Sequence, residues 1–535
     1  MFSYNIYPIV TFFTRFIPQI GIVLLAQREN QLRKNLTNTP IIEHPIEDSN
    51  RTVTHRTDDG SFNNLQCPYI GMRGQPFGRY MKATTTQFDN HPDPEIVAHH
   101  FFTRRTEKYV PHANLFVAAW LQFMIHDWFQ HKVDPTQMSE YGVHKTAFVN
   151  DTFTINENSH FWDGSQIYKD SLRLKDGSGK IRLGDNGYLP LDNQGTEDVG
   201  NGPNRWYGLM LLHLLFTKEH NYICDLLKSK YPDFDDDKLY HTARLIVVAI
   251  ITKIHTIEWT PTIVNNEVTR PAQSVIYYGF LGKNFKQILN TRIKYLSGYV
   301  QGPFFNQNVN FSHIVEFSSI YRMHSLLPDT VTIANDQVPM VDTIFNKSVD
   351  INTKYSQNDL IDSIGKNPCC SLDLSNYPEF LRKLQVNDTT VDMATVDIYR
   401  DRERLIPRYN EFRRQLKLSP IKTWSDLTKD KETIAKLKLV YNNDVERLDL
   451  LVGTHLEPKL PGSIFGDTIY SIFLLHTTRR ITNDRFLTTD FKPEVYTQFG
   501  MDYVDNTTFR DLIVRHFPEL HTSIPDNAFL LFNKN

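Results

Sequence analysis

Two long stretches without proline, residues 207–228 and 237–259, constrain the fold of this 535-residue chain more than any other feature. Both are strongly apolar and long enough for about six helical turns, so each predicts a helix that is buried in a core. Similar stretches predict further helices at residues 114–131, 312–326, 396–416 and 464–483. Pro111 stands just before the first of these, where a helix start tolerates proline. Pro407 lies inside the third and is expected to kink or break it.

Segments with the alternation of a β-strand are few and short, as at residues 330–340. No sequence period of about 20–50 residues repeats, so a solenoid or propeller is not indicated. The chain is therefore predicted to be mainly α, with one large helical domain over residues 60–535. Residues 1–59 are expected to form a separate N-terminal region of short helices and extended chain. The extended wrap is predicted to cover residues 33–95, which are rich in Asn, Thr, Pro, Asp and Gly without sustained periodicity.

The composition excludes several classes of protein. Lys and Arg number 58 against 61 Asp and Glu, a formal charge of −3, whereas a nucleic-acid binder needs a basic excess to neutralise phosphates. Four cysteines in so long a chain cannot build a disulfide framework or a paired-cysteine zinc site. Aromatic residues at 12% and twenty histidines instead suggest a cofactor pocket.

The first 26 residues are apolar enough to raise the question of targeting. Their longest uninterrupted run, Ile20 to Ala26, is far shorter than the roughly 20 residues that a membrane span needs. A signal peptide would begin with basic residues, and Met1 to Asn5 contains none. We expect two short amphipathic helices that pack on the protein, with binding to a membrane surface as the alternative. A cytoplasmic or peripheral membrane location is favoured.

Gln122 and His126 stand four residues apart in an otherwise apolar stretch. This spacing places both side chains on one face of a helix. Buried polar groups are costly unless they have partners or a chemical task, so the pair is a candidate catalytic site. A structural histidine is the alternative interpretation.

Tyr321 and His324 stand three residues apart, which makes them neighbours on a helix face. A histidine can bind haem iron, and a tyrosine close to it can be oxidised by electron transfer. The alternative is a helix end, stopped by Pro328, with both side chains half buried.

Residues 159–165, SHFWDGS, place oxygen-bearing side chains at alternate positions. Two hydroxyls, a carboxylate and backbone carbonyls suit Ca²⁺, which takes about 6–8 oxygen ligands. An Asp-Gly turn with capping serines would contain the same residues. A further polar stretch, residues 397–414, carries alternating charges that are typical of a solvated, salt-bridged helix face.

These four segments occur in one chain and in one order, and in this they resemble the animal-type haem peroxidases of the peroxidase–cyclooxygenase superfamily. The shared pattern comprises a distal histidine–aspartate pair, the S/T-x-F-x-D-x-S calcium loop, an EHN triplet, a YR-x-H segment and an RDR…P-x-YN-x-FR segment. The resemblance covers roughly residues 60–515. Within the superfamily, the segments MIHDWFQH, HTIEWT, YRMHSLLPD and IYRDRERLIPRYNEFRR are similar to the fatty-acid α-dioxygenases known best from plants.

The resemblance implies a role for each residue of a haem site. His324 would be the proximal iron ligand, His126 the distal histidine, and Gln122 its neighbour in catalysis. Asn410 would orient His324 by accepting its ring N–H. Tyr321 would be the radical tyrosine.

The resemblance also implies two further binding sites. The carboxylate of the substrate would be bound by His255, Thr260 and Arg480, with Arg479 as a candidate one residue away. Calcium would be bound by Asp127, Ser159, Phe161 (through its carbonyl), Asp163 and Ser165.

The implied cofactors are haem b and calcium, and the implied small-molecule partners are a fatty acid, dioxygen and peroxide. A tyrosyl radical would remove a hydrogen from the α-carbon of the fatty acid, and dioxygen would add there. The product would be a 2-hydroperoxy acid, which can lose CO₂ to an aldehyde one carbon shorter. A haem peroxidase that oxidises small donors is the alternative enzyme, and a lipid-binding protein without turnover is the alternative outside enzymes. A monomer is the default for the family.

Overall fold

The structure is a computed structural model that describes residues 39–44, 53–84, 91–184, 187–200, 206–266, 269–279, 282–283, 298, 300, 311–386 and 388–533. The two helices predicted within the first 26 residues lie outside these ranges. The described parts of the predicted extended wrap consist of turns, bends and isolated bridges up to residue 93, as expected. The first described helix, α3 (Pro94–Phe102), begins one residue later.

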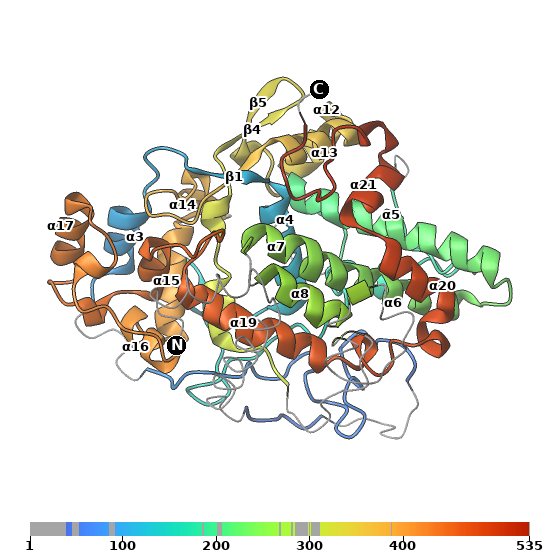
Figure 1. The fold of residues 1–535 in the computed structure, drawn as a ribbon, viewed down its shortest axis with the longest axis horizontal. Coiled ribbons are helices and arrows are strands. Elements are labelled where there is room, and N and C mark those ends of the chain that lie inside the picture. Colours follow the sequence, from blue (N-terminus) through green and yellow to red (C-terminus); the bar gives the residue numbers. More distant parts are fainter. Residues whose placement is uncertain are drawn as a thin grey trace.

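Helices α5 (Tyr207–Lys230) and α6 (Asp236–Ile254) form the centre of one group of helices, together with α20 (Pro493–Asn506) and α21 (Phe509–His516). This group occupies the right side of Figure 1. The first half of α5, residues 207–217, is buried on every side, which explains why its sequence is apolar around the whole circumference. Both long proline-free stretches are therefore confirmed as buried helices.

A second group of helices gathers around α15 (Met393–Glu403), on the left side of Figure 1. Its other members are α3, α14 (Glu379–Arg382), α16 (Tyr409–Gln415), α17 (Lys431–Val440) and α18 (Leu450–Leu456). The predicted break at Pro407 is confirmed, because α15 ends at Glu403 and α16 begins at Tyr409.

Helices α4 (Phe116–Trp128) and α19 (Asp467–Thr482) carry functional candidates. The start predicted for the first of these is wrong. Pro111 belongs to the strand β1 (Tyr109–Asn114), which pairs with β6 (Pro368–Cys370) across an irregular register. The irregularity accommodates a proline that a regular ladder would exclude.

The helix predicted over residues 312–326 is also shorter than expected. Helix α11 (Val315–Ile320) ends at Ile320, and the C-cap residue Tyr321 has φ −84° and ψ 5°. A separate 3₁₀ turn, η3 (His324–Leu326), follows. Tyr321 and His324 are therefore not neighbours on one regular helix face, although both line the same cavity.

A π-helical turn, η2 (His255–Trp259), joins α6 to α7 (Thr260–Ile263), and α8 (Thr269–Tyr278) follows. The turn is closed by the Thr260 backbone N–H, which donates to the carbonyl of His255. The Thr260 hydroxyl donates to the same carbonyl over 2.7 Å. Such π-turns are frequent at functional sites, because they rotate the side chains that follow relative to the preceding helix.

The remaining elements are short. The other helices are α12 (Lys347–Lys354) and α13 (Gln357–Lys366), and the 3₁₀ turns are η1 (Asp170–Leu172), η4 (Met340–Asp342), η5 (Trp424–Asp426), η6 (Val445–Arg447), η7 (Arg485–Leu487) and η8 (Pro518–Leu520). Besides β1–β6, the two-stranded antiparallel pairs are β2 (Val133–Met138) with β3 (His144–Thr146), β4 (Thr330–Ile333) with β5 (Asp336–Pro339), and β7 (Leu384–Val386) with β8 (Thr389–Val391). The prediction of a mainly α fold with little β is confirmed.

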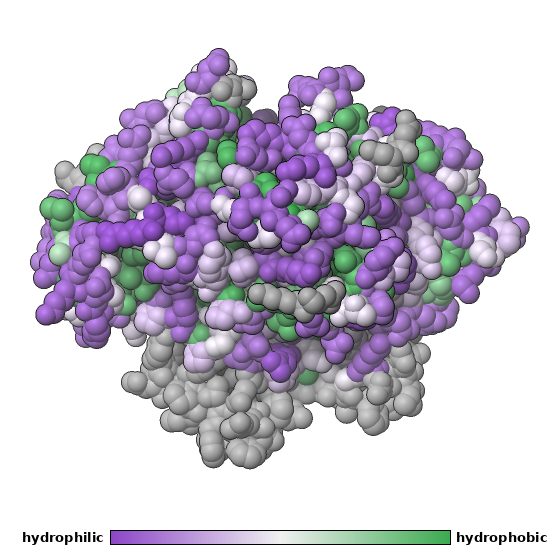
Figure 2. All heavy atoms as spheres, turned by 90° about the horizontal axis from the view of Figure 1, so that it is seen from above, coloured by the Kyte–Doolittle hydropathy of each residue, from purple (hydrophilic) through white to green (hydrophobic). Residues whose placement is uncertain are grey.

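The surface is largely hydrophilic on the face drawn in Figure 2, with hydrophobic residues scattered over it. None of the helices in the described ranges is both long and apolar enough to cross a membrane. All four cysteines are free thiols.

Candidate active site

A cavity of about 480 Å³ lies between α4, the segment after α11, and α15. Its volume falls within the range of roughly 300–1,000 Å³ that is usual for sites of small molecules and cofactors. It is lined by four of the predicted residues: Gln122, His126, Tyr321 and His324. The structure therefore brings together in one place two segments that are almost 200 residues apart in the sequence.

The orientation of Gln122 follows from its hydrogen bonds. Trp206 Nε1 donates to Gln122 Oε1 over 2.7 Å. Because an indole N–H can only donate, this bond fixes the amide so that its nitrogen faces His126. The Gln122 Nε2 to His126 Nε2 distance is 3.5 Å. Asn158 Nδ2 holds the other side of this turn, donating to the carbonyl of His126 over 2.8 Å.

The partner of His324 is Asp397 and not Asn410, which corrects the prediction. His324 Nδ1 lies 2.8 Å from Asp397 Oδ2. The hydroxyl of Tyr377 donates to the same carboxylate oxygen over 2.9 Å and lies 2.9 Å from His324 Nδ1. Burial alone would raise the pKa of Asp397, but His324 and Arg322 lower it, so the carboxylate is the acceptor here.

Asn410 has other partners because α15 and α16 are separate helices. Its amide donates to the carbonyl of Ile421 over 3.0 Å and to Glu446 over 2.9 Å, and it accepts from the Ile421 N–H over 2.9 Å. These bonds attach α16 to the chain that follows it. Asp397 lies on α15 instead, inside the charged stretch that the sequence predicted to be a solvated face.

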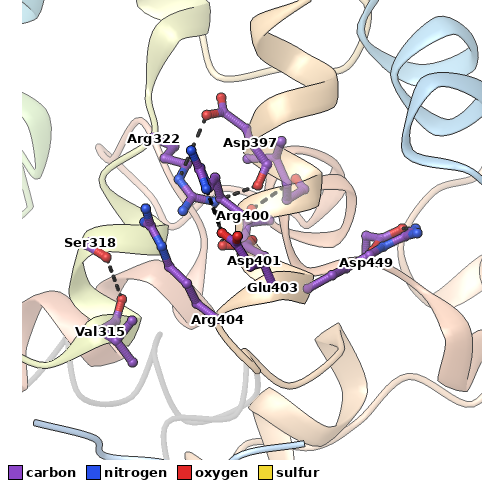
Figure 3. A network of polar contacts seen from close by, with 12 residues as sticks. Val315, Ser318, Arg322, Asp397, Arg400, Asp401, Glu403, Arg404 and Asp449 are labelled. Atoms are coloured by element: carbon purple, nitrogen blue, oxygen red, sulfur yellow. Dashed lines mark hydrogen bonds and ion pairs between the residues drawn. The ribbon is translucent and has the colours of Figure 1, made fainter. Parts of the chain in front are cut away.

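Three arginines, Arg322, Arg400 and Arg404, line one side of the cavity. Figure 3 shows them beside the acidic residues of α15. Arg322 Nη1 lies 2.6 Å from Asp401, and Arg400 Nη1 lies 2.6 Å from Glu403. Arg404 is buried, and burial together with the other two guanidinium groups lowers its pKa. This side of the cavity is suited to anionic groups on a bound cofactor.

Tyr321 is buried, and its hydroxyl has no hydrogen-bond partner in the described part of the chain. The ring of Phe317 lies 4.3 Å away and that of Trp128 6.0 Å away, centroid to centroid. Burial raises the pKa of Tyr321, which the charge of Arg480 opposes. The group is thus a neutral phenol at physiological pH, and none of the described residues engages its O–H.

Arg480 lies between two indole rings. Its Cζ is 3.4 Å from the ring centre of Trp128 and 4.0 Å from that of Trp162. The side chain is buried, and its Nε and Nη2 have no partner among the described residues. Burial lowers the pKa of Arg480 to about 9, against the opposing charges of Asp127 and Tyr321. Arg479 points elsewhere, over Phe311 at 5.6 Å.

His255 belongs to the same surroundings through the π-turn. Its ring lies 5.3 Å from Trp128 and 5.5 Å from Trp162. Trp120 Nε1 donates to His255 Nδ1 over 3.2 Å, so the neutral ring carries its proton on Nε2. Burial and the charge of Arg480 lower the pKa of His255 well below its ordinary value, and Nε2 is buried without a partner within the described ranges. The hydroxyl of Thr260, by contrast, donates its proton to the backbone carbonyl of His255 within the π-turn.

The predicted calcium loop lies next to α4. Asp127 Oδ1 accepts from the backbone N–H of Ser165 over 2.8 Å and from its hydroxyl over 3.1 Å. Asp163 accepts from the hydroxyl of Ser159 and, over 3.0 Å, from the N–H of Ser165. Phe161 packs against Phe311, and its N–H donates to Ser159 Oγ over 3.3 Å. Burial and the neighbouring Asp163 raise the pKa of Asp127 well above its ordinary value.

The loop is not a cluster of three metal-binding side chains. A group of at least three His, Cys, Asp or Glu residues able to hold a metal does not occur in the described ranges. The loop offers two carboxylates, two hydroxyls and backbone carbonyls, a donor set made of oxygen only. Two adjacent buried carboxylates need either a shared proton or a cation, so the residues fit a hard divalent ion.

A family model described as animal haem peroxidase matches residues 55–153 and 140–529 of the chain. The chain belongs to this family of haem peroxidases. Its curated relatives place it among the α-dioxygenases of the family. It is 36% identical to alpha-dioxygenase 2 of Arabidopsis thaliana, with 95% of this chain and 88% of that protein covered. It is 35% identical to alpha-dioxygenase PIOX of Oryza sativa subsp. japonica, with 94% and 90% covered.

Solved structures agree with this placement. The crystal structure of Oryza sativa fatty acid alpha-dioxygenase is similar with a TM-score of 0.91 at 34% identity, covering 97% of this chain and 94% of that one. A variant of the same rice protein, crystallised with palmitic acid, gives a TM-score of 0.90. Peroxidase A from Dictyostelium discoideum, at 22% identity and a TM-score of 0.72, shares the fold. The family implies haem as the cofactor.

Sequence reasoning missed four residues of this site: Asp397, Tyr377, Trp128 and Trp162. Asp397 carried a signal, since it lies in a motif already singled out, but alternating charge suggested a solvent-exposed face. The two tryptophans stand directly beside predicted calcium ligands. Their contact with Arg480 joins positions more than 300 residues apart, which no local pattern encodes.

Proposed function

We propose that this protein oxygenates fatty acids at the α-carbon, giving 2-hydroperoxy acids, with haem as cofactor and Tyr321 as the residue that removes hydrogen. The structural observation that carries the proposal is the position of Tyr321. Tyr321 lines the cavity of His126 and His324, and the charge of the buried Arg480 acts on it. Its hydroxyl has no hydrogen-bond partner among the described residues. The names of relatives that match over almost the whole chain support the same activity.

The residues around the cavity fit haem. His324 would hold the iron through Nε2, because Nδ1 is already occupied by Asp397. Arg322, Arg400 and Arg404 would face the carboxylates of the macrocycle. Haem supplies the one-electron oxidant of the reaction when it is bound.

His126, which lines the same cavity, would move a proton. The amide N–H of Gln122 faces its Nε2, which favours the tautomer in which Nε2 carries a lone pair. That nitrogen can take up the proton of a peroxide and return it to the other peroxide oxygen. Trp206 contributes by holding Gln122 in this orientation.

The carboxylate of the fatty acid would be bound by Arg480 and His255. Nε and Nη2 of Arg480 are adjacent donors on one edge of the guanidinium, the arrangement that binds a carboxylate through two hydrogen bonds. His255 Nε2–H is a third donor. Fixing the acid end of the chain limits which carbon can approach the oxygen of Tyr321, and that carbon is the one next to the carboxylate.

Tyr321 would carry the radical that starts the reaction. Its oxygen radical takes a hydrogen atom from the α-carbon, so a C–H bond breaks and the phenolic O–H forms. Dioxygen adds to the carbon radical. The resulting peroxyl radical takes the hydrogen back from Tyr321, which yields the hydroperoxide and restores the radical. Loss of CO₂ and water from the product gives the aldehyde one carbon shorter.

Calcium would bind at the loop of Asp127, Ser159, Asp163 and Ser165, with Phe161 contributing its carbonyl. The ion would tie this loop to the end of α4, and Asp127 directly follows His126. The proposed working form is a monomer, with dioxygen and peroxide entering as small molecules. Contact of residues 1–26 with a membrane surface stays a prediction, since those residues lie outside the described ranges.

The proposal is tested by the substitution Tyr321→Phe in the haem-loaded protein. We expect the Soret absorption to persist and oxygen uptake with palmitate to fall by at least ~1,000-fold, because phenylalanine has no O–H to oxidise. Tyr207→Phe is the matched control, a buried tyrosine on α5 whose hydroxyl contacts Ser363, and it should keep its activity. His324→Ala should lose haem. Undiminished oxygen uptake in Tyr321→Phe would exclude the radical role of Tyr321. A wild-type protein that oxidises guaiacol but takes up no oxygen with palmitate would favour the small-donor peroxidase.

A further inference from the structure

The two indoles that enclose Arg480 are the chain neighbours of the two loop carboxylates. Trp128 directly follows Asp127, and Trp162 directly precedes Asp163. The rings of the two tryptophans lie 5.2 Å apart at an interplanar angle of 80°, so they form two walls at nearly a right angle. The guanidinium lies against both walls. The backbone that positions the carboxylates therefore also positions the surroundings of Arg480.

Ring faces hold this guanidinium where most buried arginines have a carboxylate. Arg480 is 1% exposed, and no ion pair to it is found in the described ranges. A cation over an indole face is attracted by the negative face of the ring, and the attraction is stronger when the cation is desolvated. Such contacts fix the position of the group and leave its Nε and Nη2 edge for a ligand.

The loop itself is anchored from three directions. Arg244 of α6 donates from Nε to the carbonyl of Asp163 over 3.0 Å. Asp484, after α19, accepts from the N–H of Trp162 over 3.3 Å and is held by Arg56 over 2.9 Å and 3.1 Å. Asp127 holds the loop from α4 through Ser165. Because the loop is held at these points, a displacement of the Asp163 carboxylate would also displace the neighbouring Trp162.

Charge connects the two sites as well. Asp127 and Asp484 are the carboxylates whose charges act on Arg480, and His255, His313, His476 and Tyr321 feel its positive charge in return. A carboxylate ligand that approaches Arg480 is therefore opposed by Asp127. A cation between Asp127 and Asp163 would cancel that opposition.

We infer that a divalent cation bound at Asp127 and Asp163 raises the affinity of Arg480 for the carboxylate of the fatty acid, with Trp128 and Trp162 as the positioning residues that connect the two sites. This rests on the proposed function. The coupling acts through the charge of the cation and through the fixed indole walls. By linkage it is reciprocal, so a bound fatty acid tightens calcium by the same factor.

The inference is tested by calorimetry on the full-length, haem-loaded protein. Dodecanoate binding is measured after treatment with EGTA and again with saturating CaCl₂, and calcium binding is measured with and without dodecanoate. We expect calcium to tighten dodecanoate binding by about 5- to 150-fold, with an equal factor in the reverse titration. Dodecan-1-ol has the same chain without the charge, and calcium should leave its binding unchanged.

The outcomes distinguish the inference from the proposals beneath it. If both ligands bind and neither changes the other, or if dodecan-1-ol gains as much as dodecanoate, the inference is overturned and the proposed function stands. If calcium does not bind, the calcium proposal falls together with the inference. If dodecanoate does not bind in saturating calcium, the proposed carboxylate site itself is wrong.

Variants separate the positioning role from general damage. Trp162→Leu should still bind calcium but lose most of the coupling, because it removes one wall of Arg480. Trp162→Phe keeps an aromatic face, so its coupling factor should lie between that of the leucine variant and that of the wild type. Trp424→Phe is the control for a buried tryptophan in another part of the molecule, next to Tyr441. Full coupling in Trp162→Leu would show that the indole does not connect the two sites.

Discussion

Single hydrogen bonds set the chemical state of the ring nitrogens around the cavity. His324 Nδ1 faces a carboxylate, His255 Nδ1 accepts from an indole, and the amide of Gln122 is turned by another indole. For the two histidines, a carboxylate that only accepts or an indole N–H that only donates determines which nitrogen carries the proton. For Gln122, the indole of Trp206 determines which end of the amide faces His126. The histidines could be chosen from the sequence, but their partners come from distant segments. The sequence therefore indicated Asn410 as the partner of His324, where the structure has Asp397.

The assignment of Asp397 can be checked by the reduction potential of the haem. Replacing a carboxylate by a neutral amide weakens the negative charge behind His324, and this disfavours the oxidised metal. Asp397→Asn should therefore raise the midpoint potential by ~59 mV or more, a tenfold change in a one-electron equilibrium. Asn410→Ala is the control and should leave the potential as it is in the wild type. A spectroelectrochemical titration in which only Asn410→Ala shifts the potential would restore the first assignment.

At the scale of elements, helices could be predicted from proline-free apolar stretches but their ends could not. The buried helices α5 and α6 and the break at Pro407 agree with the sequence. The end of α11 at Ile320 and the π-turn at His255 do not follow from any residue that breaks helices. Two candidate site residues, Tyr321 and His255, lie at these irregular ends.

The junction of α15, α16 and α18 depends on one buried carboxylate, Asp449. Arg402 Nη2 lies 2.8 Å from it, Arg408 also pairs with it, and Tyr441 donates over 3.0 Å. Asp449→Asn leaves both guanidinium groups without their counter-charge. We expect the free energy of unfolding, measured with urea, to fall by about 3–5 kcal/mol. Asp336→Asn, an exposed partner of Lys354, should cost no more than ~1 kcal/mol, and equal losses in the two variants would contradict this account.

Acid should remove the contribution of Asp449 over a defined range. Burial alone would raise the pKa of Asp449, but Arg402 and Arg408 lower it to about 2, below the ordinary value of 3.8. A lowered carboxyl pKa stabilises the fold above the unfolded pKa, and this contribution is lost as the pH falls through the folded one. Between pH 4 and pH 2 the wild type should therefore lose stability more steeply than Asp449→Asn. Parallel slopes in urea titrations over this range would show that the pKa is not lowered.

At the scale of the whole molecule, the fold brings α4, the predicted calcium loop, the π-turn and α19 around one buried arginine. The order of motifs along the chain predicted the family and the mainly α architecture. It could not predict that Trp128 and Trp162 meet at Arg480, because that contact depends on how helices distant in sequence pack. The similarity to a solved α-dioxygenase structure covers almost the whole chain, so the overall arrangement of the backbone is shared.

The central claim, oxygenation at the α-carbon, is tested most directly by the product. The haem-loaded protein is incubated with palmitate under ¹⁸O₂, and the products are identified by mass spectrometry. The account predicts 2-hydroperoxypalmitate with both heavy oxygen atoms in the hydroperoxy group at the α-carbon, accompanied by the aldehyde one carbon shorter. Recovery of unchanged palmitate from a protein that oxidises guaiacol with peroxide would contradict it.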